Sequence, residues 1–181
     1  MEEHRKIVLG VTGSIAAYKS ADIIRQLQKK GFKVSTVMTK NAECFITPLT
    51  LSTLCNEKVY RETKHSLSMP HIDLMKGAQG FLIAPATANI IGKMANGIAD
   101  DILSSVVLVA KCPIILAPAM NTAMYQNSIV QENVAKLKTH GIHFIDPVEG
   151  DLACGITGEG HIAPVEKIVD CVENYINSHT A

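Results

Sequence analysis

"KIVLGVTG" (residues 6–13) decides the fold, because an apolar run rich in Val and Ile ends there in a glycine. The run has the length and composition of a buried strand. Residues 14–30 (SIAAYKSADIIRQLQKK) have apolar positions at helical spacing and stop at Gly31, a residue typical of helix C-termini. A second apolar run follows at KVSTVMT (33–39). Strand, helix and strand in this order predict a βαβ unit with parallel strands.

The same alternation continues toward the C-terminus. Further strands are expected at GFLIAPA (80–86), PIILAPAMN (113–121) and HFIDPV (143–148). Helices are expected at ITPLTLSTLC (46–55), ANIIGKMA (88–95), ADDILSSVVLVA (99–110), MYQNSIVQENVAKLKTH (124–140) and PVEKIVDCVENYI (164–176). In the first of these helices, Thr47 is the expected cap and Pro48 lies in the first turn. Because the strands are apolar throughout, helices must cover both faces of the sheet. The sequence therefore predicts an α/β protein, a three-layer sandwich with a parallel sheet between two layers of helices.

Length and charge narrow the class of protein. A chain of 181 residues is long enough for one core, and we expect a single domain over residues 1–181. The 17 Lys and Arg residues balance the 17 Asp and Glu residues, which disfavours binding to nucleic acid or to an anionic membrane. No apolar run reaches the length of a membrane span, and the opening MEEHRK does not resemble a signal peptide. We therefore expect a cytoplasmic protein.

The cysteines argue against a disulfide framework and against a metal site. They form an odd set without a CxxC pair: Cys44, Cys55, Cys112, Cys154 and Cys171. Cys154 stands apart because it lies in GDLACGITGEGH (150–161), a segment with four glycines and no apolar periodicity. Such a segment is typical of a mobile loop that covers a site. An inert, packed Cys154 is the competing interpretation.

The end of the first strand has the features of an anion site. In VTGSIAA (11–17), Gly13 and Ser14 stand between a strand and a helix, where backbone N–H groups can approach a phosphate closely. A simple strand-to-helix turn explains Gly13 equally well. The pattern is not GxGxxG, and the second strand ends at Thr39 and Lys40 instead of the acidic residue that a dinucleotide site requires.

Two later strands end in the same Ala-Pro-Ala sequence. In APATAN (84–89), Pro85 ends the strand, small residues leave room for a flat ligand, and Asn89 offers hydrogen bonds, although Thr87 or Asn89 is equally suited to cap a helix. In APAMN (117–121), the repeat of this plan suggests that two loops hold one ligand, with Asn121 directed into the shared crevice. Met120 and Met124 would then form an apolar wall, unless they are ordinary core residues.

His71 is the histidine of PHIDL (70–74), just before the third strand. A single histidine beside apolar residues is more often a structural residue than a catalytic one. The local sequence supplies no partner for its ring. Local reasoning therefore leaves both roles open.

Several motifs together resemble one known family. GSIAAYK (13–19), FITPLT (45–50), HIDL (71–74), PATAN (85–89), PAMNTAMY (118–125) and ACG (153–155) are similar to the homo-oligomeric flavin-containing cysteine decarboxylases. The resemblance covers about residues 6–170, and it is closest to the members of coenzyme A biosynthesis. It implies a flavodoxin-like or Rossmann-like fold, an FMN cofactor, and assembly into trimers or dodecamers with active sites between subunits.

The resemblance also implies roles for the candidate site residues. Gly13 and Ser14 would hold the FMN phosphate, and the flavin would contact Thr39, Phe45, Pro85, Thr87, Ala88 and Asn89. His71 would act as an acid/base group or position the substrate, and Asn121 would hydrogen-bond the substrate carboxylate, with Ala119, Met120 and Met124 beside it. Cys154 would supply a proton during reduction.

The implied reaction converts 4′-phosphopantothenoylcysteine to 4′-phosphopantetheine. A cysteinyl carboxylate needs an electron sink before it loses carbon dioxide. FMN provides it by oxidising the CH2–SH group to a thioaldehyde, so that the electrons of the breaking bond flow into the C=S group. Reduced flavin then returns the hydride to the resulting enethiol, and no external redox partner is consumed.

The chain departs from the pattern of the resembled family at three positions. Ile156 stands where an acid is common, His161 where an arginine is common, and Asp101 where an asparagine is usual. The altered lid keeps a second candidate open, a peptidyl-cysteine decarboxylase of lanthipeptide biosynthesis. A non-catalytic FMN-binding regulatory relative is a third. The presence of His71, Asn121 and Cys154 together favours an enzyme.

Overall fold

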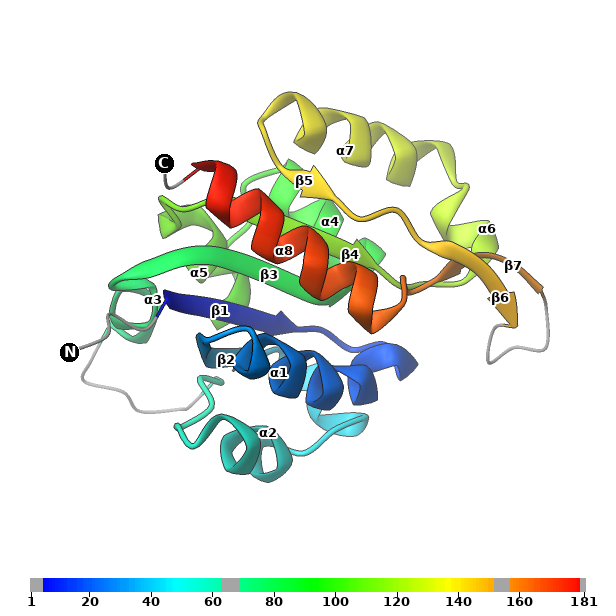
Figure 1. The fold of residues 1–181 in the computed structure, drawn as a ribbon. Helices are drawn as coiled ribbons and strands as arrows, with labels where there is room; N and C mark the ends of the chain where they lie inside the picture. The colour runs from blue at the N-terminus through cyan, green and yellow to red at the C-terminus, as the bar shows by residue number, and fades with distance from the viewer. Residues whose placement is uncertain (1–4, 63–68, 152–156, 180–181) are drawn as a thin grey trace.

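A parallel sheet forms the centre of the molecule. The computed structural model describes residues 5–62, 69–151 and 157–179, and within them five strands have the order β2-β1-β3-β4-β5 (Figure 1). The strands are β1 (Arg5–Val11), β2 (Phe32–Met38), β3 (Ala78–Ala86), β4 (Ile114–Pro118) and β5 (His143–Phe144). All neighbouring strands pair in parallel.

Helices cover both faces of this sheet. They are η1 (Ile15–Lys19), α1 (Ser20–Lys29), η2 (Lys40–Cys44), α2 (Pro48–Cys55), α3 (Pro70–Met75), α4 (Ala88–Ala95), α5 (Ile102–Val109), α6 (Thr122–Tyr125), α7 (Ser128–Thr139) and α8 (Val165–His179). Residues of α1, α2 and α8 join the core on one face, and residues of α3, α4, α5 and α7 join the core on the other (Figure 1). The predicted three-layer α/β sandwich is confirmed.

The central strands are apolar throughout because both of their faces are buried. Ile7 and Leu9 of β1 pack into the core with α1 and α8, whereas Val8 between them packs into the opposite core. β3 alternates in the same way, with Leu82 on the first side and Phe81 on the second. This is the period of two that strand geometry imposes. Two helical layers are therefore needed to cover one sheet.

Local capping residues define the start of α2. The hydroxyl of Thr47 accepts a hydrogen bond from the Thr50 N–H at 3.1 Å, and Pro48 occupies the first turn of α2. Both features were expected, because a threonine cap and an early proline satisfy or remove N–H groups that the helix itself leaves unpaired. The start of α2 is confirmed.

Two predicted helices differ from the observed ones. The helix expected over residues 124–140 is divided into α6 and α7, because the Asn127 side chain accepts a hydrogen bond from the Ile129 N–H at 3.0 Å and begins a new helix. The helix expected over residues 14–30 begins as the tighter 3-10 turn η1 before α1 follows. Near His71, the short helix α3 was not predicted.

The two ends of the glycine-rich segment are β-strands. Strands β6 (Val148–Asp151) and β7 (Thr157–His161) pair antiparallel and form a hairpin. The interpretation of residues 150–161 as a loop is therefore wrong for these strands. The connection between them, which includes Cys154 and Ile156, lies outside the described residues.

No helix of the described ranges combines the length and the apolar character that crossing a membrane requires. Cys44, Cys55, Cys112 and Cys171 are free thiols.

Candidate active site

The strand order creates a crevice at the carboxyl ends of β1 and β3. The chain first runs outward from β1 to β2 and then returns to place β3 on the other side of β1. The loops that follow β1 and β3 therefore leave the sheet in different directions. In open parallel sheets, ligands bind in the space between two such loops, and flavodoxin-like sheets of this order bind FMN there.

A cleft of about 430 Å³ occupies this position. Its size falls in the range of roughly 300–1,000 Å³ that is usual for cofactor and small-molecule sites. The lining residues come from the ends of β1, β2 and β3, from η2, α4 and α6, and from the segments that contain Glu62 and precede α5: Thr12, Gly13, Thr39, Lys40, Asn41, Glu62, Thr87, Asn89, Ile90, Lys93, Asp100, Asp101 and Met124. The structure thus brings five of the predicted site residues together: Gly13, Thr39, Thr87, Asn89 and Met124.

The buried side chain of Thr12 ties the two loops of the crevice to each other. Its hydroxyl donates to the Pro85 carbonyl oxygen at 2.7 Å and accepts from the Thr87 N–H at 3.2 Å. One hydroxyl therefore satisfies a carbonyl and an N–H group that the end of β3 leaves without strand partners. These bonds therefore join the turn after β1 to the loop after β3.

Gly13 brings the turn after β1 into close contact with η2. A Cβ atom at this position would lie 2.6 Å from Asn41 Cβ, a distance that real side chains do not show. The neighbouring Ser14 turns the chain into η1, since its hydroxyl accepts from the Ala16 N–H at 3.3 Å. The turn is therefore built without side chains between its backbone and the cleft, which suits close approach of a ligand phosphate.

A buried hydroxyl group lies just after the end of β2. The Thr39 hydroxyl oxygen is buried and has no hydrogen-bond partner among the described residues, and Thr39 lines the cleft. A buried hydroxyl without a partner is unfavourable unless a ligand or water completes it. The cleft also has two amines at its wall, Lys40 and Lys93. A flavin mononucleotide fits this donor set, because its phosphate and ring carbonyls are acceptors.

An ion-pair cluster forms the far wall of the cleft. Lys93 Nζ lies 2.6 Å from an Asp100 carboxylate oxygen and 2.7 Å from an Asp101 carboxylate oxygen. Asp101 also caps α5, since its carboxylate accepts from the Ser104 N–H at 2.8 Å. Burial alone would raise the pKa of Asp101, but the hydrogen bonds from Lys93 and Ser104 outweigh it and hold that pKa below its usual range. Asp101 is therefore a charged, fixed part of the wall.

The same cluster raises the pKa of Lys93. Burial opposes this, but hydrogen bonds to Asp100 and Asp101 outweigh it. The Lys93 side chain is 16% exposed, and it therefore keeps its positive charge next to the cleft at neutral pH.

His71 lies in a second pocket next to the cleft. This pocket has a volume of about 250 Å³ and is lined by Arg61, Glu62, Pro70, His71, Ala99, Asp100, Asp101, Ile102 and Ser105. Glu62, Asp100 and Asp101 line both cavities. The pocket of His71 and the cleft thus share one acidic wall. His71 is half-buried on α3.

The loop after β4 has different surroundings. Ala119 is buried and its N–H donates to the Ala86 carbonyl at 3.0 Å, which joins the loops after β3 and β4. The next N–H, that of Met120, donates to the Gly160 carbonyl of the hairpin at 3.1 Å. Asn121 begins α6, and its side-chain oxygen accepts from the Ala123 N–H at 2.9 Å. This loop therefore packs beneath the hairpin.

Three further predicted site residues, Phe45, Pro85 and Ala88, are not among the residues that line the cleft. Pro85 follows a cis peptide bond and offers its carbonyl to Thr12. Ala88 is the first residue of α4. Phe45 ends η2 with 45% of its surface exposed, which leaves its ring available to a ligand or a second subunit. Cys154 lies outside the described residues.

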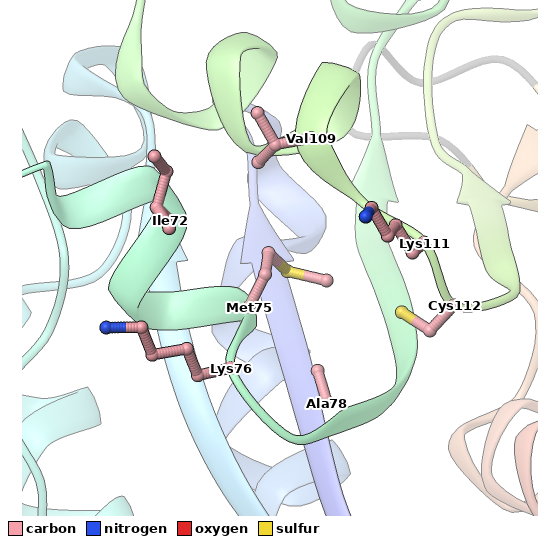
Figure 2. Close-up of a pocket in the computed structure, with 7 residues that line it drawn as sticks. All are labelled: Ile72, Met75, Lys76, Ala78, Val109, Lys111 and Cys112. Atoms are coloured by element: carbon pink, nitrogen blue, oxygen red, sulfur yellow. The ribbon is translucent and has the colours of Figure 1, made fainter.

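A third cavity of about 360 Å³ lies at the opposite end of the sheet. Figure 2 shows Ile72 and Met75 of α3, Ala78 at the start of β3, and Val109 and Cys112 at the end of α5 around it. Because it adjoins the amino end of β3, it is remote from the place where parallel sheets bind ligands. The cleft beside Gly13 is therefore the candidate active site.

Sequence reasoning missed several lining residues. Thr12 was quoted within VTGS without a role, although a hydroxyl at a strand end is a detectable signal. Asn41, Glu62, Lys93 and Asp100 follow from no local pattern. They reach the cleft only because η2, α4 and the segment before α5 meet beside the carboxyl ends of the strands.

The fold and site agree with one known family. The chain matches the flavoprotein family over residues 1–177, and it belongs to this family. The resemblance inferred from the motifs is confirmed.

One curated relative is similar over almost its whole length. The probable phosphopantothenoylcysteine decarboxylase of Streptococcus mutans is 44% identical over 177 residues, which cover 95% of this chain and 99% of the relative. The first curated relatives are bifunctional coenzyme A biosynthesis proteins, and this chain spans about half of their length, 46% and 45% for two of them.

Solved structures of similar proteins give the same picture. A PPC decarboxylase variant complexed with pantothenoylaminoethenethiol has a TM-score of 0.87 and 28% identity, with 97% of this chain and 100% of that chain covered. The FMN-dependent cysteine decarboxylase SpaF has a TM-score of 0.83 and 29% identity, with 96% and 97% covered.

Proposed function

We propose that this protein is an FMN-dependent decarboxylase that converts 4′-phosphopantothenoylcysteine to 4′-phosphopantetheine in coenzyme A biosynthesis. The observation that carries the proposal is the cleft at the reversal of strand order, because motif residues from three strand ends line it. The similarity to the Streptococcus mutans relative supports the substrate. Similarity to an FMN-dependent cysteine decarboxylase supports the cofactor.

The residues around the cleft fit FMN in a defined way. The turn at Gly13 and Ser14 would hold the phosphate through backbone N–H groups. The unpartnered hydroxyl of Thr39 would donate to the cofactor. Thr87 and Asn89, at the start of α4, would contact the flavin together with Ala88 and Pro85. The chemistry that FMN supplies when bound is reversible hydride transfer with the CH2–SH carbon.

The chain itself would bind the substrate and move protons. An amide NH2 group donates to carboxylates, and the Ala123 N–H fixes the Asn121 amide by donating to its oxygen. Asn121 would therefore hold the substrate carboxylate, with Ala119, Met120 and Met124 as neighbours. His71 would take and return the proton of the substrate thiol or position the substrate. Cys154 would donate a proton when the enethiol is reduced.

We also propose a homo-oligomer, either a trimer or a dodecamer, as the active form. One subunit places His71 beside the cleft and Asn121 under the hairpin, so that a second subunit is needed to enclose one substrate between them. Large apolar side chains are exposed beside His71 in the sequence and on α5: Met69 is 64%, Ile72 is 43% and Leu108 is 54% exposed. Burial of such side chains commonly drives association. A cytoplasmic location follows from the proposed metabolic role.

The experiment that tests the reaction is mass spectrometry of products from two substrates. The purified protein, reconstituted with FMN, is incubated with 4′-phosphopantothenoylcysteine or with a peptide that ends in cysteine. We expect loss of carbon dioxide from the first and formation of the saturated aminothiol. Turnover of the peptide alone would establish the peptidyl-cysteine decarboxylase instead. A protein that takes up no FMN would contradict the cofactor assignment.

Two substitutions separate the proposed steps. His71→Asn should abolish carbon dioxide release while FMN stays bound, because the acid/base group is lost and the cleft is not. Cys154→Ser should still release carbon dioxide but yield the enethiol, which is lighter than the aminothiol by two hydrogen atoms. Normal turnover by His71→Asn would remove this residue from the mechanism.

A further inference from the structure

The hairpin β6–β7 lies against two loops of the candidate site. Gly158 is so close to Thr122 that an added Cβ would lie 2.6 Å from the threonine hydroxyl. At Gly160, φ is +143° and an added Cβ would collide with the Met120 carbonyl oxygen. The backbone of β7 thus packs directly on the loop after β4. A pair of side chains at the end of β7 makes a further contact between the hairpin and the rest of the molecule.

This pair is formed by Lys19 and His161. Lys19 is the last residue of η1, which follows the turn at Gly13, and His161 is the last residue of β7. Lys19 Nζ lies 3.0 Å from His161 Nε2, across 142 positions of sequence. The His161 ring also lies against Gly150 of β6, where an added Cβ would be 3.2 Å from His161 Cγ. The His161 ring therefore lies between Gly150 of β6 and Lys19 of η1.

The contact requires an unprotonated Nε2 on His161. An ammonium group has only donors, so the imidazole nitrogen must be the acceptor. Protonation of Nε2 removes the acceptor and places a second positive charge beside Lys19. Burial lowers the pKa of Lys19, and nearby Glu166 opposes this shift. Two cations in this partly buried place would repel each other.

Several charged groups lie on the described elements that surround the pair. Glu166 at the start of α8 accepts a hydrogen bond from Gln26 of α1 at 3.2 Å. On the hairpin, β6 carries Glu149, and β7 carries Glu159, which lines a separate cavity with Tyr125 and Asp146. The loop of residues 120–122 has no charged residue.

We propose that Lys19 and His161 form a proton-sensitive latch that holds the hairpin β6–β7 on the turn after β1 and on the loop after β4. Both are positioning residues. The latch is closed while His161 is neutral and opens when His161 is protonated. Its catalytic consequence rests on the proposed function: the hairpin packs on the loop that carries Asn121, so opening weakens substrate binding.

Hydrogen exchange of the hairpin amides tests the latch without cofactor or substrate. Exchange of residues 148–151 and 157–161 is followed by mass spectrometry at about pH 7.5 and about pH 5.5, on either side of the ordinary histidine pKa, and corrected for the intrinsic rate. In the natural sequence, protection should fall about tenfold at the lower pH. His161→Gln keeps an acceptor that does not titrate, so its protection should be equal at both pH values.

Lys19→Met provides a second, independent variant. It removes the donor, and hairpin protection should therefore be low and independent of pH. His140→Gln, at an exposed histidine that ends α7, is the matched control and should behave as the natural sequence does. Equal protection of the natural sequence at both pH values, or a pH response retained by His161→Gln, would overturn the latch.

The catalytic consequence is measured separately. The ratio of KM for 4′-phosphopantothenoylcysteine between the natural sequence and His161→Gln should rise about tenfold at about pH 5.5, with FMN affinity unchanged. Because both proteins meet the same substrate, titration of the substrate phosphate cancels in this ratio. A constant ratio would overturn the consequence for catalysis. Absence of turnover would refute the proposed function, while the exchange result would still decide the latch.

Discussion

Strands β3 and β4 are neighbours and both end in Ala-Pro-Ala, yet the loops that follow have different surroundings. After β3, Thr87 and Asn89 line the cleft. After β4, Ala119 is buried and Met120 binds the hairpin through its backbone. The same three residues at a strand end therefore do not specify the same environment.

The difference comes from the position of each strand in the sheet. β3 borders β1, where the order reverses and a crevice opens, whereas β4 lies between β3 and β5. Side chains tie the first loop, since the Thr12 hydroxyl bonds to both Pro85 and Thr87. Backbone bonds tie the second. We therefore expect the first loop to serve the cofactor and the second to serve the substrate, and the following substitutions test this division.

Gly13→Ala should have the largest effect, and it should act on the cofactor side alone. The new methyl group would lie 2.6 Å from Asn41 Cβ, so the turn must move away from the cleft. Overpacking of this kind costs about 1–3 kcal/mol, which corresponds to a roughly 5- to 150-fold loss of FMN affinity. Titration of flavin fluorescence measures it. Gly92→Ala on α4 is the control, because only Asn133 Nδ2 at 3.9 Å is near.

Thr12→Val should separate the loop after β3 from the turn after β1. The valine leaves the Thr87 N–H and the Pro85 carbonyl without their partner. Loss of buried hydrogen bonds should lower the free energy of unfolding by about 2 kcal/mol. Thr12→Ser retains the hydroxyl and should recover most of it. Equal midpoints of denaturation for Thr12→Val and the natural sequence would show that this tie is unimportant.

Gly160→Ala should act on the substrate side. Its φ of +143° disfavours a side chain, and the Met120 carbonyl occupies the space. Displacement of the hairpin should raise KM for the substrate about tenfold, or about 1.4 kcal/mol, without loss of FMN affinity. Steady-state kinetics and flavin titration of the same sample distinguish the two. A variant that lost FMN with KM unchanged would refute the division of roles.

Asp101→Asn should give the smallest effect, on the wall shared by the cleft and the pocket of His71. The asparagine still caps α5 but loses its charge toward Lys93, so the free energy of unfolding should fall by about 1 kcal/mol at neutral pH. Burial would raise the pKa of Asp101, but hydrogen bonds from Lys93 and Ser104 outweigh burial and hold that pKa in the folded protein below its unfolded value. The Asp101 carboxylate therefore stabilises the folded protein fully above the pKa that it has in the unfolded chain. This stabilisation is lost as the pH falls through the pKa of Asp101 in the folded protein.

Denaturant unfolding of both proteins at several pH values measures this effect. The difference between the free energies of unfolding of the two proteins should disappear at acidic pH, where Asp101 is protonated in the folded and in the unfolded state. Asp100→Asn is the matched control, because the Asp100 side chain is 59% exposed and should contribute less. A difference that stays constant down to acidic pH would mean that the charge is not its source.

Short-range features of the fold were predictable because their causes lie within a few residues. Thr47 and Pro48 begin α2 as expected, since the hydrogen bond to Thr50 spans one turn. The break at Asn127 was missed, although it is the same kind of local cap. The hairpin was missed for another reason: antiparallel pairing of glycine-rich segments leaves no apolar alternation to detect.

Long-range features of the site were not predictable from spacing. Lys93 meets Asp100 and Asp101 because a turn brings the end of α4 next to the start of α5. Lys19 meets His161 from the other end of the chain. No local pattern contains either contact, since each depends on where separate elements pack against the sheet.

The sequence by itself determined the α/β class, the positions of the strand ends and the residue types that they carry. Periodicity and capping are local, and they follow from the geometry of single strands and helices. The tertiary structure alone decided which strand ends meet in one cleft, with Gly13, Thr39 and Thr87 together and the loop of Asn121 beneath the hairpin. The physical reason is the strand order, which packing of both helical layers selects and which no segment encodes alone.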